Sequence, residues 1–102
     1  MDESTRILLK EKLKSIFHLQ FESVLNYGTL LLYEDMFTVG YYLTLDKDRF
    51  EDKFITQCVV EYFIESKSII IYTYNYSENL TKIIISSNLD NLFKISKILS
   101  DI

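Results

Sequence analysis

The sequence predicts an α+β fold, an antiparallel sheet of four to five strands with helices packed on it. Three observations support this class. Apolar residues recur at helical spacing near both ends of the chain, runs rich in Ile, Tyr and Thr fill the middle, and no Pro- or Gly-rich linker interrupts the 102 residues. We expect a single domain over residues 1–102 with the order α-β(β)β-α-ββ-α.

Residues 3–19 predict an amphipathic helix that begins after a capping residue. Its apolar stripe is formed by Leu9, Leu13, Ile16 and Phe17. Either Asp2 or Ser4 can cap the N-terminus of this helix. His18 lies near its expected C-terminal end, where a cation interacts favourably with the helix dipole.

Strand-like runs follow between residues 21 and 45. Residues 29–33 and 36–45 predict two strands, whereas residues 21–26 suit either a strand or a continuation of the first helix. Gly40 interrupts the second of these strands and indicates a bulge or a close approach of another backbone.

Residues 49–65 combine two conflicting signals. Apolar residues form a stripe at helical spacing, and Asp48 and Glu51 have the spacing of a helix-capping pair, but several members of the stripe are β-branched. We expect a helix here, with a strand as the alternative. Residues 68–76 and 80–87 then predict a hairpin around residues 77–79, and residues 89–101 predict a last helix capped by Asn88.

The composition bounds the class of protein. The fractions of 48% hydrophobic and 25% charged residues are those of a folded globular chain. Cys58 is the only cysteine and no export segment is visible, so we expect a reducing, cytoplasmic location and neither a disulfide nor a cysteine metal site. No apolar stretch is long enough to span a bilayer. The abundance of residues with AT-rich codons indicates a low-GC bacterium, a phage or a virus. For a viral protein, the expected location is the host cytoplasm.

The most distinctive local pattern is a row of tyrosines. Tyr72, Tyr74 and Tyr76 alternate along one expected strand and therefore point to the same face of the sheet. Such a row suits a protein interface, a platform on which single-stranded bases stack, or simple cross-strand packing beneath a helix. We take these three tyrosines as the candidate partner-binding residues. The net charge of −4 favours a protein partner over nucleic acid, which needs a basic groove.

Other patterns point only weakly to chemistry. Glu65 and Lys67 have the E-x-K spacing of one superfamily of metal-dependent nucleases. We nevertheless expect them to be ordinary charged residues in a turn between two elements. The acidic run that starts at Asp46 and Asp48 lacks the glycine and the last glutamate of a calcium loop. A single histidine excludes zinc sites with several imidazoles. Cys58 falls on an apolar stripe and is expected in the core. We expect no cofactor, no metal and no catalytic residues.

These observations predict a non-enzymatic protein–protein interaction module, a homodimer that acts as an accessory protein and binds or inhibits an unidentified partner protein. The expected order of elements resembles that of small acidic type III secretion chaperones, which implies a dimer that holds partner segments in extended form. The alternative is a nucleic-acid-binding protein that uses the tyrosine face, and a metal-dependent nuclease is a third, less favoured reading. No membrane association is expected.

Overall fold

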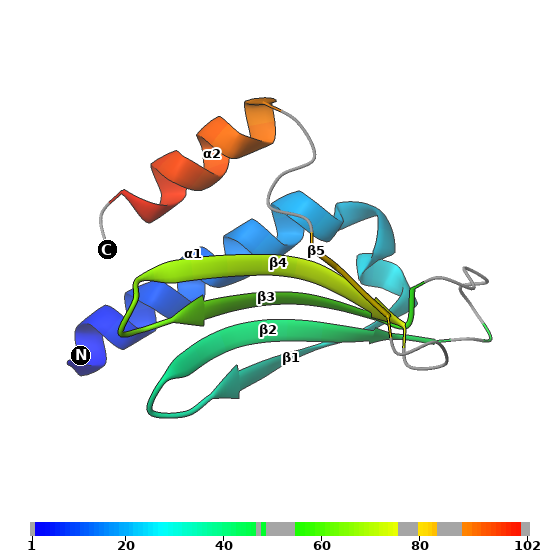
Figure 1. Cartoon of the computed structure of the whole chain (residues 1–102), viewed down its shortest axis with the longest axis horizontal. Coiled ribbons are helices and arrows are strands. Elements are labelled where there is room, and N and C mark those ends of the chain that lie inside the picture. Colours follow the sequence, from blue (N-terminus) through cyan, green and yellow to red (C-terminus); the bar gives the residue numbers. More distant parts are fainter. Residues whose placement is uncertain (1, 47, 49–54, 76–79, 84–88, 101–102) are drawn as a thin grey trace.

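The computed structural model describes the backbone of residues 2–46, 48, 55–75, 80–83 and 89–100. Figure 1 shows one five-stranded sheet with its helices on one side. Its elements are α1 (Glu3–Phe21), the 3₁₀ helix η1 (Glu22–Tyr27), β1 (Gly28–Glu34), β2 (Thr38–Leu45), β3 (Gln57–Phe63), β4 (Ser68–Asn75), β5 (Leu80–Ile83) and α2 (Leu89–Leu99).

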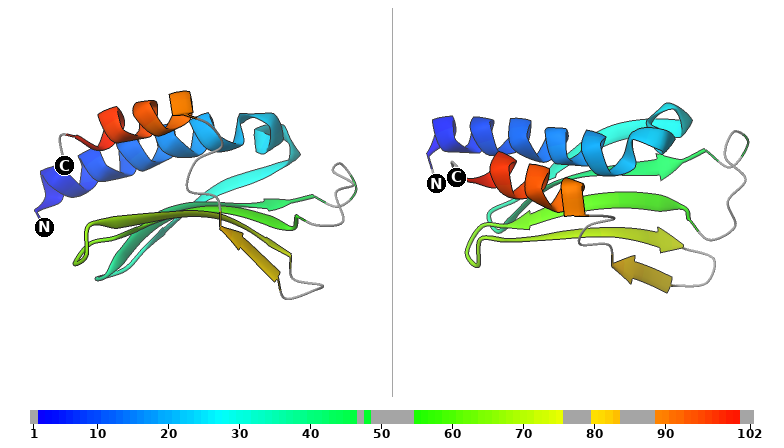
Figure 2. Two further views of the ribbon diagram at one scale, coloured as in Figure 1. Left: turned by 45° about the horizontal axis from the view of Figure 1, so that its top comes forward. Right: turned by 90° about the horizontal axis from the view of Figure 1, so that it is seen from above.

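The sheet is an antiparallel meander. The strands lie in the order β1-β2-β3-β4-β5, so each strand pairs with the next strand along the chain. Both helices lie side by side on one face, here called the helix face (Figure 2). The opposite face, here called the open face, is covered by no described helix or strand. The predicted α+β class and antiparallel sheet are confirmed.

The apolar stripe of α1 makes the core, as predicted. Leu9, Leu13, Ile16 and Phe17 are all fully buried, and the helix packs on β2 and β3. Asp2 is the N-cap, because its Oδ1 accepts a hydrogen bond of 2.7 Å from the N–H of Thr5. The choice between Asp2 and Ser4 is thereby settled in favour of Asp2.

The predicted helix over residues 49–65 is wrong for the part that the structure describes. Gln57–Phe63 is the central strand β3, and residues 49–54 lie outside the described chain. The physical reason is burial on both faces: Val59 lies on the open face and Val60 on the helix face, yet both are buried. Cys58, Val59 and Val60 are therefore three consecutive buried residues, and such a continuous apolar run also matches a helical stripe. The element order that resembled type III secretion chaperones is therefore not found.

Residues 21–26 form neither a strand nor a regular continuation of the first helix. α1 ends at Phe21, and the chain tightens into the 3₁₀ helix η1. Phe21 and Val24 are buried three residues apart, which is the spacing that a 3₁₀ helix places on one side. The predicted strands at 29–33 and 36–45 are found as β1 and β2, with ends shifted by one or two residues. β4, β5 and α2 match the described parts of the predicted hairpin and last helix, whereas residues 76–79, 84–87 and 101 lie outside the described residues. The expected cap Asn88 lies outside the described residues.

A matched pair of phenylalanines tests the assignment of the core. Phe17 of α1 faces the core and is 0% exposed, whereas Phe93 of α2 is 68% exposed. We expect Phe17→Ala to lower the free energy of unfolding by about 3–5 kcal/mol, because it opens a cavity. Phe93→Ala should change it by less than about 0.5 kcal/mol. Denaturant unfolding followed by circular dichroism measures both values, and equal losses would contradict this core.

Candidate functional site

The register of the strands sets two rows of side chains across the open face. One row runs through Tyr33, Gly40 and Glu61, and the next runs through Leu31, Tyr42, Val59 and Tyr72. The residues that alternate with them, such as Leu43, Val60 and Ile71, are buried on the helix face. The open face is thus rich in tyrosine, although none of the described helices packs on it.

The predicted tyrosine row is placed on this face. Tyr72 and Tyr74 point away from the helices and are half-buried. Ile71 and Thr73, which alternate with them along β4, are buried on the helix face. Packing beneath a helix, one of the three readings of the row, does not hold for these two residues. Tyr76 lies outside the described residues.

A hollow of about 550 Å³ lies in the open face beside Tyr72. Its lining includes Tyr33 of β1, Tyr42 of β2 and Tyr72 of β4, together with Gly40 and Glu61. A second hollow of about 440 Å³ is lined by Gln57, Tyr72, Tyr74 and Thr81. Because Gln57 and Tyr72 line both hollows, they form one groove that crosses the strands from β1 to β5.

Gly40 makes the first hollow possible. A Cβ atom at this position would lie 2.6 Å from the backbone oxygen of Val60 and 3.2 Å from the Cα atom of Glu61. The pairing of β2 with β3 continues through Gly40 without a bulge. The close backbone approach, one of the two predicted explanations, is therefore the correct one. Position 40 leaves a gap in the row between Tyr33 and Glu61.

Glu61 is the charged residue of the hollow. Its Oε1 accepts a hydrogen bond of 2.8 Å from the hydroxyl of Tyr72, which orients the carboxylate along the open face. Glu61, Tyr33 and Tyr42 were not predicted from the sequence, because only the strand register brings them together. The available signal was the alternation of Glu61 with buried residues once residues 57–63 are assigned to a strand.

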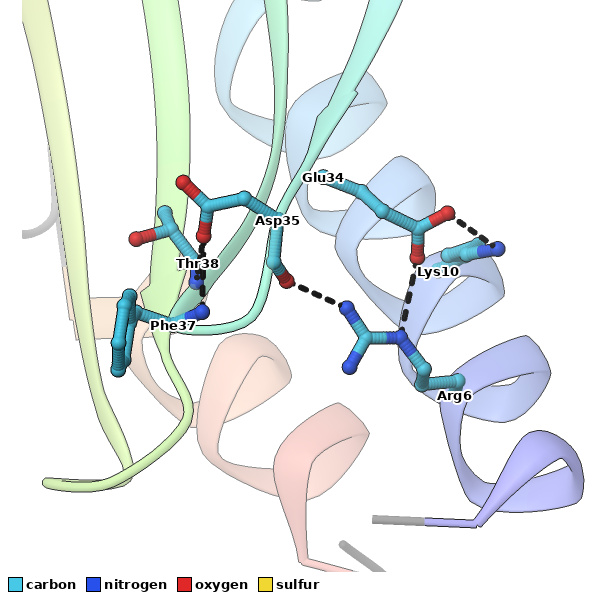
Figure 3. A network of polar contacts seen from close by, with 6 residues as sticks. All are labelled: Arg6, Lys10, Glu34, Asp35, Phe37 and Thr38. Atoms are coloured by element: carbon cyan, nitrogen blue, oxygen red, sulfur yellow. Dashed lines mark hydrogen bonds and ion pairs between the residues drawn. The ribbon is translucent and has the colours of Figure 1, made fainter.

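The turn between β1 and β2 holds the rim of the hollow. Asp35 Oδ1 accepts hydrogen bonds of 2.8 Å from the backbone N–H groups of Phe37 and Thr38 (Figure 3), and its Oδ2 accepts one of 2.7 Å from the Tyr33 hydroxyl. The Phe37 amide, followed by the Tyr33 hydroxyl and the Thr38 amide, lowers the pKa of Asp35 below its ordinary value of 3.8. The same hydrogen bond raises the pKa of Tyr33.

α1 is tied to this turn by two cations. Arg6 Nε lies 3.2 Å from Glu34 Oε2, Arg6 Nη2 donates to the backbone oxygen of Asp35 at 2.6 Å, and Lys10 Nζ lies 3.0 Å from Glu34 Oε1 (Figure 3). Lys10 and then Arg6 lower the pKa of Glu34. These contacts lie on the helix face, so they fix the end of β1 without entering the hollow.

The outer edge of β1 is the second feature of the site. Just beyond the two ends of β1, Asp46 N–H donates to Tyr27 O and Asp35 N–H donates to Thr38 O. Because hydrogen-bonded pairs alternate along antiparallel strands, the odd-numbered residues of β1 direct their N–H and C=O groups toward β2. The even-numbered residues of β1 therefore point their N–H and C=O groups away from β2, where no described strand lies. These residues are Gly28, Leu30, Leu32 and Glu34. By contrast, the β4 edge beside Tyr72 and Tyr74 is covered by β5.

The other patterns singled out in the sequence are not brought together into a site. Glu65 and Lys67 lie in the turn between β3 and β4, as expected, and Lys67 has a φ of 54°. His18 lies in the last turn of α1, also as expected. Cys58 is buried, and burial raises the pKa of its thiol to about 12, so it is no nucleophile at neutral pH.

Within the described ranges, no three His, Cys, Asp or Glu side chains gather where they could hold a metal ion. Asp46 and Asp48 of the acidic run are described, whereas Glu51 and Asp52 lie outside those ranges. In the same part of the chain, no helix has the length and apolar character to cross a membrane. No protein-family model, curated protein or solved structure matches this chain.

The pH dependence of stability tests the role of Asp35. A lowered pKa means that this carboxylate stabilises the folded state above pH 3.8, and that this contribution is lost as the pH falls through the folded pKa. We expect Asp35→Asn to melt below the wild type at pH 7 and to converge with it near about pH 2. Thermal melts from pH 7 downward measure this difference, with Glu65→Gln in the β3–β4 turn as the control. Parallel curves for wild type and Asp35→Asn would contradict the assignment.

Proposed function

We propose that this protein is a non-enzymatic protein–protein interaction module that forms a homodimer through β1 and presents its tyrosine face to a partner protein. One observation carries the proposal, the free outer edge of β1. Leu31, Leu32 and Tyr33 on this strand are exposed apolar residues, and the strand contains no proline or lysine. An uncovered, apolar edge strand is a template for pairing with another chain.

The edge is self-complementary. An antiparallel pairing centred on Leu31 places Leu30 opposite Leu32 of the second copy and Gly28 opposite Glu34, and all four residues have outward N–H and C=O groups. On the open face, Thr29 then lies opposite Tyr33 of the second copy. This register brings no two like charges opposite each other. A twofold axis through Leu31 satisfies the requirement of an isologous dimer.

Such a dimer keeps the tyrosine groove accessible. The twofold axis is perpendicular to the sheet, so the helices of both copies lie on one side and both open faces lie on the other. Tyr72 and Tyr74 sit on strand β4, three strands away from the dimer edge. We propose these tyrosines as partner-binding residues, and the sheet supports this because the face that carries them has no covering helix (Figure 2).

The charge of the groove favours a protein partner over nucleic acid. Glu61 is the charged side chain among the residues that line the first hollow, and a phosphate backbone would be repelled by it. The E-x-K pattern gives no support to a nuclease, because Glu65 and Lys67 lie in a turn. The free thiol of Cys58 fits a protein that acts in the cytoplasm. The abundance of residues encoded by AT-rich codons fits an accessory protein of a virus, phage or low-GC bacterium.

A pair of lysine substitutions tests the dimer. Leu31→Lys puts two lysines opposite each other at the twofold axis, whereas Thr81→Lys adds the same charge to the same face at the other edge. At about 500 µM, a concentration suited to a small interface, we expect wild type and Thr81→Lys to scatter light as twice the chain mass of 12.1 kDa. Leu31→Lys should scatter as a monomer.

Amide hydrogen exchange locates the interface independently. The amides of Leu30 and Leu32 point outward, so we expect them to be protected in the wild type and to exchange fast in Leu31→Lys. The amides of Leu31 and Tyr33 bond to β2 and should stay protected in both proteins. A wild-type monomer at this concentration, or a dimer in which Leu30 and Leu32 exchange freely, would overturn pairing through β1.

A further inference from the structure

We propose that the hollow between Tyr33, Tyr42 and Tyr72 binds the cationic side chain of a lysine or arginine in the partner protein. The proposal rests on the interaction-module function above and names the chemistry of the partner. It requires the open face but not the β1 edge. The site is built by Glu61 as the anion, three tyrosine rings as its walls and Gly40 as the gap between them.

The charge of the hollow is negative and uncompensated by the described cations. Among the described residues, no lysine or arginine lines it, and Arg6 and Lys10 form ion pairs with Glu34 on the helix face. At the rim, Arg6 acts on the Asp35 carboxylate, so the charge that lacks a described ion pair is that of Glu61. An incoming ammonium or guanidinium group would therefore be attracted to Glu61.

The carboxylate is held in place but retains capacity to bind. The Tyr72 hydroxyl donates to Glu61 Oε1 at 2.8 Å, which fixes the orientation of the group before a ligand arrives. A carboxylate has about four acceptor positions, so one hydrogen bond leaves room for the donors of a lysine or arginine. Pre-positioned acceptors reduce the ordering cost of binding.

Aromatic walls distinguish a cation from other ligands of this groove. A cation within about 6 Å of a tyrosine ring is attracted by the electron-rich face of the ring. The volume of about 550 Å³ is in the range of small-ligand sites and accepts a long side chain. The adjoining hollow at Gln57, Tyr74 and Thr81 continues the groove, so the segment that carries the cation can lie across the strands.

The experiment uses short peptides as probes. Acetyl-Gly-Gly-Lys-Gly-Gly-amide, its arginine counterpart and its norleucine counterpart are titrated into the ¹⁵N-labelled full chain and followed by amide chemical shifts. We expect saturable shifts at Gly40, Glu61 and their neighbours with the lysine and arginine peptides, with a Kd of about 1–10 mM. The norleucine peptide, which has the same apolar stem without charge, should cause no saturable shift.

Glu61→Gln and Glu65→Gln form the matched pair of variants. Glu61→Gln keeps the shape of the hollow and removes its charge, and we expect it to weaken binding by about tenfold or more. Glu65→Gln removes one exposed charge from the neighbouring turn and should leave the affinity unchanged. Tyr42→Ala removes one wall and should also weaken binding, which gives a second test if Glu61→Gln unfolds.

Three results would overturn the proposal. These are no saturable shift up to about 20 mM peptide, equal binding of the norleucine peptide, or unchanged affinity in both Glu61→Gln and Tyr42→Ala. The titration is repeated on the wild type diluted to a concentration at which light scattering shows a monomer, which separates the two proposals. Binding that persists in this monomer supports the cation site whatever happens to the dimer. A dimer that forms without any peptide binding leaves the interaction module intact and removes the cation site.

Discussion

The packing of α1 on β2 and β3 is the contact on which the rest of the structure depends. Four apolar residues of α1 are fully buried there, and each strand must present its own alternate apolar residues to them, Val39 and Leu43 from β2 and Val60 from β3. A slip of one residue in any strand would turn these side chains to the open face. The stripe of α1 thus selects the register of the sheet and, with it, the residues left on the other side.

The open face has to be stable without a covering helix, and the tyrosines make this possible. Val59 is 4% exposed although it lies on this face, because Tyr42 and Tyr72 flank it across the neighbouring strands. Aromatic and β-branched residues that face each other stabilise an antiparallel sheet. The same side chains that protect the sheet therefore supply the walls of the groove. Gly40 is the position in this face where the covering side chains give way to a hollow.

Much of the fold follows from local sequence patterns. The stripe of α1, the cap at Asp2, the strands on either side of Asp35 and the alternation of Tyr72 and Tyr74 are all predictable from spacing. The central strand β3 was not, because the buried run of Cys58, Val59 and Val60 interrupts the polar alternation that marks a strand. Once β3 is missed, the positions that depend on it are missed as well.

The candidate site illustrates this dependence. Tyr72 and Tyr74 could be chosen from sequence because they belong to one strand, whereas Tyr33, Gly40 and Glu61 are neighbours only through the pairing of three strands. Pairing is a non-local property that composition and spacing do not encode. The free edge of β1 depends in the same way on knowing which strands lie at the ends of the sheet.

The meander order of the strands also has a kinetic consequence. Every strand pair joins neighbours along the chain, so the sheet closes through local loops at a low cost in chain entropy, which favours fast folding. β1 and β2 precede the other strands during synthesis, and the outer edge of β1 is complete as soon as these two strands pair. In the proposed dimer, two chains growing on one messenger RNA would therefore be able to meet through β1 before α2 leaves the ribosome. Assembly would then begin during translation, while the groove on β3 and β4 is still being made.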